Sequence, residues 1–221
     1  YLVDRPTVLN ILWRTKVIRD TGLAFFARHP EAWGVNLGCG LSQYFQWLDN
    51  GRNTWLDTDM RPSMELRRRL LPPDTERQRS AIIDLRRPQW WQDLNLPAQA
   101  LGQPLFMLCE GVLMYLQPQQ VRHVLHSFAA QAPAGSHLVI DILAGCAVGM
   151  AQWHASVGPT NAQFRWGIRS LSELTDCHPR LRLLATHSVA ASHGWMGIAA
   201  ERMWSYWSST PLYGVVELGV D

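Results

Sequence analysis

The sequence lacks the features by which a nucleic-acid-binding protein or a membrane protein is recognised. Charged residues make up only 17% of its 221 positions, and the formal net charge is +2. This near balance argues against a nucleic-acid partner bound mainly through its phosphates. The chain has no run of 18 apolar residues and no signal-peptide pattern, so we expect a protein that stays in the cytoplasm and contacts no membrane.

Cysteine is scarce and is not arranged to hold a metal. The chain has 4 cysteines, which form no C-x-x-C pair and no spacing typical of zinc ligands: Cys39, Cys109, Cys146 and Cys177. We therefore expect free thiols in a reducing compartment and no bound metal.

The composition is typical of one domain of ordinary size. With 47% hydrophobic residues, a chain of 221 is long enough to bury a substantial core without disulfides or metals. The 11 tryptophans are a high number. They indicate either a well-filled aromatic core, which we favour for any single tryptophan, or a pocket for a flat apolar ligand, and the sequence alone does not separate the two.

The most informative stretch is a short apolar strand that runs into a glycine-rich turn. The strand covers Val35 to Leu37 and is followed by Gly38-Cys39-Gly40, while an acid, Asp59, follows the next predicted strand. A sharp turn lets the backbone pass close to a ligand, and a later carboxylate can accept hydrogen bonds from ribose hydroxyls. This combination is the pattern of a nucleotide-binding α/β domain.

The turn differs from those that bind dinucleotides or nucleoside triphosphates. A dinucleotide motif has a third glycine where this chain has Gln43, and no Gly-Lys-Ser/Thr sequence follows the turn. NAD, FAD, ATP and GTP are therefore poor candidates. The remaining pattern fits a ligand that has a ribose but no phosphate chain, of which S-adenosylmethionine is the common one.

Strands alternate with helices along most of the chain. Apolar periodicity predicts helices at 7–28, 42–48, 64–71, 118–131 and 196–208, and strands at 35–37, 53–57, 81–85, 105–109, 137–143, 181–189 and 213–218. Because the first five strands are apolar and separated by helices, we predict an α/β fold. Its Rossmann-like sheet has about seven mostly parallel strands with helices on both faces.

We expect a single domain over residues 1–221. Its parts are an N-terminal helix at 6–30, a cofactor-binding core at 33–143 and a C-terminal strand-helix-strand unit at 171–221. Between the last two, residues 144–170 begin with a stretch rich in alanine and glycine. This segment after the fifth strand is a candidate lid over the site.

Three acids follow predicted strands at the edge where open parallel sheets bind ligands. Asp59 comes after the second strand, Asp84 closes the third and Glu110 closes the fourth. Each has a structural alternative: Asp59 as a helix cap, Asp84 as a turn cap or a partner of the arginines after it, and Glu110 as a solvated surface acid. Asp57 competes with Asp59 for the ribose.

The run Arg67-Arg68-Arg69 is predicted to be a solvated helix face.

Several segments share their pattern with one known family. They are Arg14-Thr15, Val35-Asn36-Leu37-Gly38-Cys39-Gly40-Leu41, Asp57-Thr58-Asp59-Met60, Met64-Glu65-Leu66-Arg67-Arg68-Arg69-Leu70-Leu71-Pro72 and Cys109-Glu110-Gly111-Val112-Leu113-Met114-Tyr115-Leu116. Together they resemble the leucine carboxyl methyltransferase family, which includes bacterial O-methyltransferases associated with polyketide biosynthesis. The last segment is the most specific. One departure is Ser42-Gln43-Tyr44, where family members often have Asp-Thr-Arg.

The resemblance implies a class I methyltransferase sheet that binds S-adenosylmethionine. The residues that it places around this cofactor are Arg14, Gly38, Gly40, Asp59, Asp84, Leu85 and Glu110. It implies that Arg14 faces the methionine carboxylate, that the glycine turn lets the backbone approach, and that Asp59 holds the ribose. Asp84-Leu85 would then lie beside the adenine and Glu110 near the amino-acid end. A guanidinium suits a carboxylate because it donates two parallel hydrogen bonds, although Arg14 could instead be a helix-surface arginine.

The resemblance further implies methyl transfer to oxygen. The expected acceptor is a carboxylate or hydroxyl of a small molecule, for example of polyketide type. Methylation of a protein C-terminal carboxylate is one alternative, and a cofactor-binding module without catalysis is another. The sequence leaves both the catalytic residues and the oligomeric state open.

Two features in the last third of the chain concern the acceptor. A hydroxyl acceptor would benefit from a general base, for which His154, His187 and His193 are candidates of which none stands out. Met203, Trp204 and Trp207 share one face of a predicted helix. We favour core packing or a subunit interface for this face over an aromatic acceptor pocket.

Overall fold

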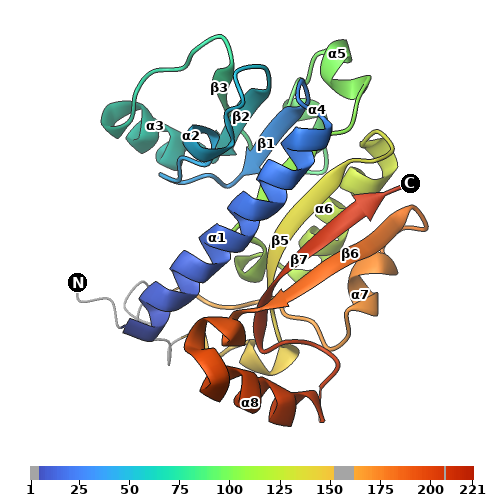
Figure 1. Cartoon of the computed structure of the whole chain (residues 1–221). Coiled ribbons are helices and arrows are strands. Elements are labelled where there is room, and N and C mark those ends of the chain that lie inside the picture. The colour runs from blue at the N-terminus through green and yellow to red at the C-terminus, as the bar shows by residue number, and fades with distance from the viewer. Residues whose placement is uncertain (1–4, 152–161, 207) are drawn as a thin grey trace.

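A seven-stranded sheet forms the centre of the molecule, with the strand order β3-β2-β1-β4-β5-β7-β6 (Figure 1). The computed structural model describes residues 5–151, 162–206 and 208–221. The strands are β1 (Trp33–Leu37), β2 (Thr54–Asp59), β3 (Gln78–Ile82), β4 (Phe106–Cys109), β5 (His137–Leu143), β6 (Leu181–Ser188) and β7 (Tyr213–Val220). The first five are parallel, and β7 runs antiparallel to both β5 and β6. The predicted α/β fold is confirmed.

Helices cover both faces of this sheet. The long α1 (Arg5–Arg28) and the short α2 (Phe45–Leu48) pack on one face, and α4 (Trp90–Asp93) and α6 (Pro118–Gln131) pack on the other. Figure 1 shows α1 crossing the sheet diagonally. The remaining helices are α3 (Arg61–Leu70), α5 (Ala98–Leu101), α7 (Ser172–Thr175) and α8 (Gly194–Ser205).

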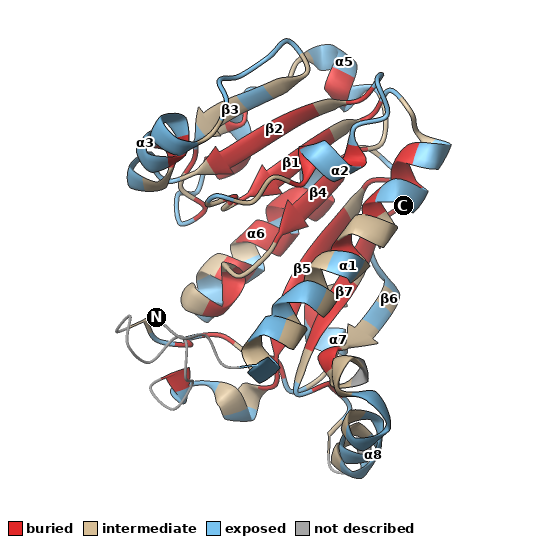
Figure 2. Cartoon of the chain, turned by 60° about the vertical axis from the view of Figure 1, so that its left-hand side comes forward, coloured by how far each residue is buried: buried red, intermediate tan, exposed pale blue. Residues whose placement is uncertain are grey.

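The central strand β4 shows how one apolar run serves two cores. Its side chains alternate, so Met107 and Cys109 join the core under α4 and α6, whereas Phe106 and Leu108 join the core under α1. All four are fully buried, and Figure 2 shows the same burial along the central strands. A strand that is covered on both faces needs apolar residues at successive positions, which explains the continuous apolar sequence of β4.

The tryptophans divide between core and surface. Trp55 and Trp90 are fully buried and belong to opposite cores. Trp195 on α8 is 79% exposed and Trp47 is 50% exposed. The expectation of core packing is therefore confirmed for the first two and wrong for the last two.

Most elements differ from their predicted bounds by a few residues, and two of these differences have a clear local cause. The third strand ends at Ile82 rather than 85, because its pairing with β2 stops where Asp59 meets Ile82. Leu85 beyond it is buried in the core but belongs to no strand. Its apolar side chain, which contributed to the strand prediction, is explained by this packing. The helix after β1 begins at Phe45 rather than 42, since the Ser42 hydroxyl donates to the Cys39 carbonyl and closes the preceding turn.

Parts of the C-terminal predictions fall outside the described residues, including His154, Trp207 and the middle of the candidate lid, 152–161. Before that gap, η2 (Gly145–Ala147) follows β5, and after it Ile168 bridges to Ala144. Within the described ranges, no helix is long and apolar enough to cross a membrane. In the same ranges, no cluster of three potential metal ligands occurs.

Candidate functional site

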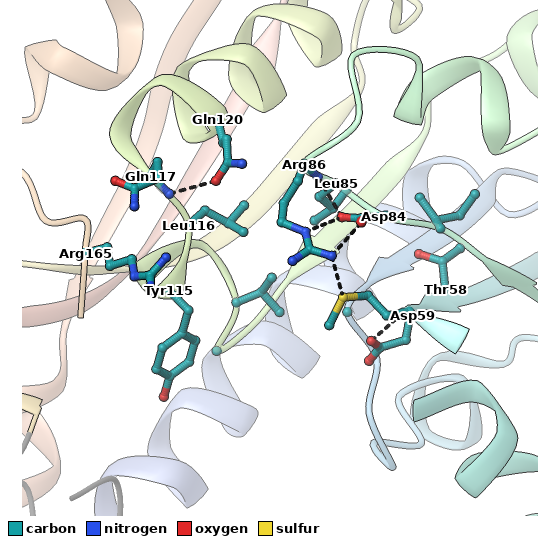
Figure 3. A pocket seen from close by; sticks show the side chains of 15 residues that line it. Thr58, Asp59, Asp84, Leu85, Arg86, Tyr115, Leu116, Gln117, Gln120 and Arg165 are labelled. Atoms are coloured by element: carbon teal, nitrogen blue, oxygen red, sulfur yellow. Dashed lines mark hydrogen bonds and ion pairs between the residues drawn. The ribbon is translucent and has the colours of Figure 1, made fainter. Parts of the chain in front are cut away.

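A cavity of about 480 Å³ opens at the carboxyl ends of the parallel strands, next to the point where the chain order reverses between β1 and β4. This is where open α/β sheets bind ligands. Its lining includes the predicted site residues Gly38, Asp59, Asp84 and Leu85, three of which are labelled in Figure 3. Arg14, Gly40 and Glu110 do not line it.

The glycine turn is shaped by its own backbone contacts. Gly38 has φ +74°, and a Cβ there would lie 2.3 Å from Cγ2 of Val112, so no larger residue fits without strain. The amides of Gly38 and Cys39 both donate to the Thr58 carbonyl, at 2.8 and 2.9 Å. The Gly40 amide donates to Oδ2 of Asp59 at 2.8 Å. All three amides of the turn are thus bonded within the protein.

Asp59 joins the turn to the end of β2. Its Oδ1 accepts the Met60 amide at 2.6 Å while its Oδ2 accepts that of Gly40. The helix α3 is capped by Met60 rather than Asp59, so the helix-cap alternative is wrong. Each carboxylate oxygen has two lone pairs, and each here accepts one backbone amide, which leaves acceptor capacity in the cavity wall.

Asp84 forms an ion pair with an arginine two residues away. Its carboxylate accepts the Arg86 Nη2 at 2.7 Å, the Arg86 Nε at 2.8 Å and the Arg86 amide at 3.0 Å. The side-chain hydrogen bonds from Arg86 lower the pKa of Asp84. The predicted pairing with a following arginine is therefore confirmed, and the prediction that Asp84 closes a strand is wrong. Both side chains line the cavity, as Figure 3 shows.

Arg14 and Glu110 meet in a buried polar cluster behind the cavity wall. Nε of Arg14 lies 2.5 Å from Oε1 of Glu110, and its Nη1 lies 2.9 Å from Oδ2 of Asp141. The Asp141 side chain is fully buried, and those of Glu110 and Arg14 are 12% and 17% exposed. A Cβ on Gly111, which lines the cavity, would lie 3.9 Å from Nη1 of Arg14. The surface alternatives for Arg14 and Glu110 are wrong.

Two tyrosines complete this cluster. The Tyr44 hydroxyl donates to Oε2 of Glu110 at 2.8 Å, and the Tyr213 hydroxyl donates to Oδ2 of Asp141 at 2.8 Å. Burial raises the pKa of both phenols, and the neighbouring carboxylates raise it further. Burial acts to lower the pKa of Arg14, but Asp141 and the other partners raise it overall. One guanidinium faces two carboxylates, so the cluster carries one net negative charge.

Comparison with known proteins identifies the family. The family model for leucine carboxyl methyltransferase matches residues 4–129, more than half of the chain. The chain belongs to the leucine carboxyl methyltransferase family. All seven predicted site residues lie within the matched range, whereas Asp141 and Tyr213 lie beyond it.

A curated relative and several solved structures are similar to this chain. The tetracenomycin polyketide synthesis O-methyltransferase TcmP of Streptomyces glaucescens is 27% identical over 184 residues, which cover 82% of this chain and 65% of TcmP. A structure from Thermobifida fusca, described as a candidate methyltransferase, has a TM-score of 0.66 at 18% identity and covers 98% of this chain and 81% of its own. PKMT2 of Rickettsia typhi, solved with AdoHcy, has a TM-score of 0.59 at 9% identity, over 86% of this chain and 49% of its own. These structures share the fold.

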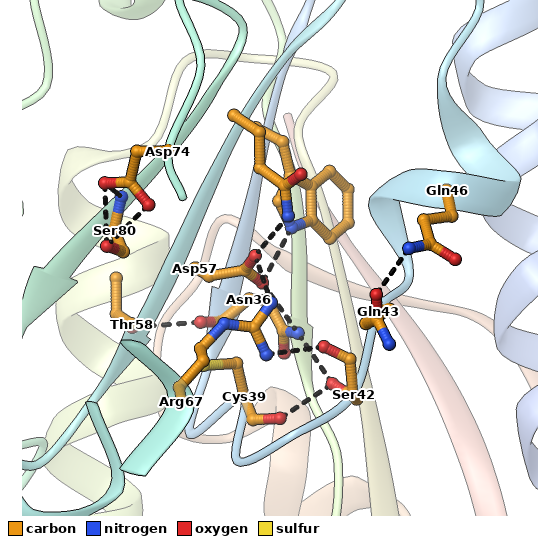
Figure 4. A network of polar contacts seen from close by, with 12 residues as sticks. Asn36, Cys39, Ser42, Gln43, Gln46, Asp57, Thr58, Arg67, Asp74 and Ser80 are labelled. Carbon is orange, nitrogen blue, oxygen red and sulfur yellow. Dashed lines mark hydrogen bonds and ion pairs between the residues drawn. The ribbon is translucent and has the colours of Figure 1, made fainter. Parts of the chain in front are cut away.

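In this member of the leucine carboxyl methyltransferase family, Arg67 is a buried residue rather than part of a solvated face. Its side chain is 8% exposed, and its Nη2 lies 2.7 Å from Oδ2 of Asp57. Its Nη1 donates to the carbonyls of Gly40 and Ser42, which fixes the far side of the glycine turn. Figure 4 shows Arg67 beside Asp57 and Ser42. The arginines at 68 and 69 are exposed as predicted.

Asp57, the predicted alternative to Asp59, belongs to this buried pair. It also accepts hydrogen bonds from Asn36 Nδ2 at 3.2 Å, Trp55 Nε1 at 2.9 Å and Gln78 Nε2 at 2.9 Å. With its side chain 2% exposed and four donors around it, Asp57 is satisfied inside the protein. It does not line the cavity.

Sequence reasoning missed Tyr44, Asp141 and Tyr213. A lone acid inside the otherwise apolar strand 137–143 was an available signal, because a buried carboxylate requires a partner. The two tyrosines gave no local signal.

Of the histidines proposed as bases, His193 bonds Asn10 Oδ1 at 2.8 Å and His187 packs edge-on against Trp13. In the described part of the chain, no histidine lines the cavity.

Proposed function

We propose that the chain is an S-adenosylmethionine-dependent O-methyltransferase that methylates a small acidic molecule in the cytoplasm. The observation that carries the proposal is the cavity, which has an acid suited to a ribose, Asp59, in its wall and the Arg14 cluster, suited to an amino-acid group, behind Gly111. Membership of the family supports the cofactor, as do neighbours of the same fold that are described with SAM or AdoHcy. The chain spans about 65% of TcmP.

The residues of the ribose end fit the cofactor. Asp59 accepts two backbone amides, which fix its orientation, and its remaining lone pairs would accept hydrogen bonds from the ribose hydroxyls. Leu85 and Met60 offer apolar surface to the adenine in the same cavity. The amides of the glycine turn are already bonded to Thr58 and Asp59, which argues against a ligand with a phosphate chain because such ligands need free amides.

The Arg14 cluster fits the amino-acid end. Among the described residues, the hydrogen bonds of the Arg14 guanidinium are donated by Nη1, to Asp141 and Tyr213, while Nε lies beside Glu110. None of these residues accepts a hydrogen bond from Nη2. Nη2 is therefore the donor that we assign to the methionine carboxylate. The net negative charge of the cluster then offsets the ammonium group.

The acceptor is best supported as a carboxylate. S-adenosylmethionine supplies an electrophilic methyl group, and a carboxylate attacks it without a general base. Tyr115 lines the cavity, but burial raises the pKa of its hydroxyl, which makes it a poor base near neutral pH. Within the described lining, no histidine is available as a base for a hydroxyl acceptor, which favours the carboxylate. The name of TcmP supports a polyketide-type acceptor.

The test is methyl transfer from radiolabelled S-adenosylmethionine into an extract of the native host. The proposal predicts label in small molecules that is released as methanol by mild alkali, because methyl esters hydrolyse and methyl ethers do not. Alkali-stable label would support a hydroxyl acceptor instead, and label in the protein fraction would support a protein carboxylate. No label with folded protein that binds the cofactor would contradict catalysis.

A further inference from the structure

The cavity has a charged end that the cofactor assignment does not use. Arg165 lines it beside Tyr115 and Gln117, on the opposite side from Asp59 and Asp84 (Figure 3). Among the described residues, no carboxylate lies within ion-pair distance of Arg165, whereas the other arginine in the lining, Arg86, is paired with Asp84. One end of the cavity therefore has the acid Asp59 and the ion pair of Asp84 and Arg86, and the other end has the cation Arg165.

The backbone around Arg165 is fixed. Its amide and that of Trp166 both donate to the Met114 carbonyl, at 2.8 and 3.2 Å. The Phe164 ring packs on the Tyr115 ring with centroids 5.7 Å apart. Trp166 is buried beyond it. The exposed Arg165 side chain thus extends from a segment whose backbone is already anchored, so an anion has to order the side chain alone.

We propose that Arg165 binds an anchoring carboxylate of the methyl acceptor, which is not the group that is methylated. An aromatic part of the acceptor lies beside Tyr115. This inference rests on the proposed function and names its substrate class: a planar aromatic acid with an anchoring carboxylate. A guanidinium forms two parallel hydrogen bonds with such a group. Arg165 does not hold the reacting oxygen, because bonds to its lone pairs would reduce its nucleophilicity. The carboxylate of the cofactor is assigned to Arg14, not Arg165.

The test compares two probes of nearly the same shape, the anionic 2-naphthoate and the neutral 2-naphthamide, by isothermal titration with and without S-adenosylhomocysteine. Wild-type protein should bind the acid at least about tenfold more tightly than the amide. Arg165→Gln should abolish this preference, and Arg165→Lys should retain part of it. Arg169→Gln is the matched control, because Arg169 is an exposed arginine of the same segment that does not line the cavity.

The outcomes separate this inference from the proposed function. Equal binding of acid and amide to the wild type, no binding of either at millimolar concentration, or an unchanged preference in Arg165→Gln would overturn the role of Arg165. A loss of S-adenosylhomocysteine affinity in Arg165→Gln would also overturn it, since Arg165 would then hold the cofactor. Failure of the folded wild type to bind S-adenosylhomocysteine would instead overturn the proposed function. Circular dichroism of each variant confirms that it is folded.

Discussion

Removal of the Arg67 side chain should destabilise the protein strongly. In Arg67→Met the apolar stem is largely kept, but the buried Asp57 carboxylate loses its only ionic partner among the described residues, 2.7 Å away. Its three remaining donors are neutral: Asn36, Trp55 and Gln78. Breaking a buried pair from one side costs about 3–5 kcal/mol. Two backbone carbonyls of the glycine turn also lose their donor.

Urea unfolding followed by tryptophan fluorescence measures this cost. For a domain of this size, a loss of 1 kcal/mol lowers Tm by roughly 2–4 °C. The Tm of Arg67→Met should therefore be lower than that of the wild type by roughly 6–20 °C. Arg68→Met is the control, because that exposed neighbour should change stability by less than about 0.5 kcal/mol. The double variant Arg67→Met/Asp57→Asn should recover part of the loss, since no unpaired charge remains buried. If Arg67→Met and Arg68→Met unfold alike, the pair does not support the turn.

Two further predictions concern the turn and the cluster. Gly38→Ala should destabilise the protein more than Gly40→Ala, because both have positive φ but only the Gly38 Cβ would meet Val112, at 2.3 Å; equal urea midpoints for the two variants would refute the steric argument. Tyr213→Phe should weaken S-adenosylhomocysteine binding by roughly tenfold, since its hydroxyl contacts both Arg14 and Asp141. Binding of adenosine, which lacks the amino-acid end, should stay unchanged in calorimetry, and a parallel loss of both ligands would show a merely structural role.

Local sequence signals predicted the elements that depend on local causes. The helix α6 has its predicted bounds, 118–131, because Pro118 occupies its first turn and the chain reaches Pro133 just beyond its end. The strand β5 likewise matches 137–143. The glycine turn is predictable from sequence because side chains larger than glycine rarely adopt the positive φ found at Gly38.

Contacts between distant segments could not be predicted in the same way. Arg14 meets Asp141 127 residues away, and Tyr213 reaches the cluster only because β7 pairs antiparallel with β5, with Leu143 opposite Tyr213. No local pattern specifies that pairing. Arg67 differs, because it lies three residues after the buried Met64 on one helix face. That spacing distinguishes it from the exposed arginines beside it.

The central claim is that the cavity lined by Asp59, with the Arg14 cluster behind its wall, binds S-adenosylmethionine. Titration calorimetry with S-adenosylhomocysteine tests it most directly, with wild type, Asp59→Ala and the control Glu65→Ala, an exposed acid on α3 outside the cavity. We predict binding to the wild type and the control, and a loss of about 1–3 kcal/mol, or roughly 5- to 150-fold, in Asp59→Ala. No binding to the folded wild type, or equal affinity in all three proteins, would contradict the claim.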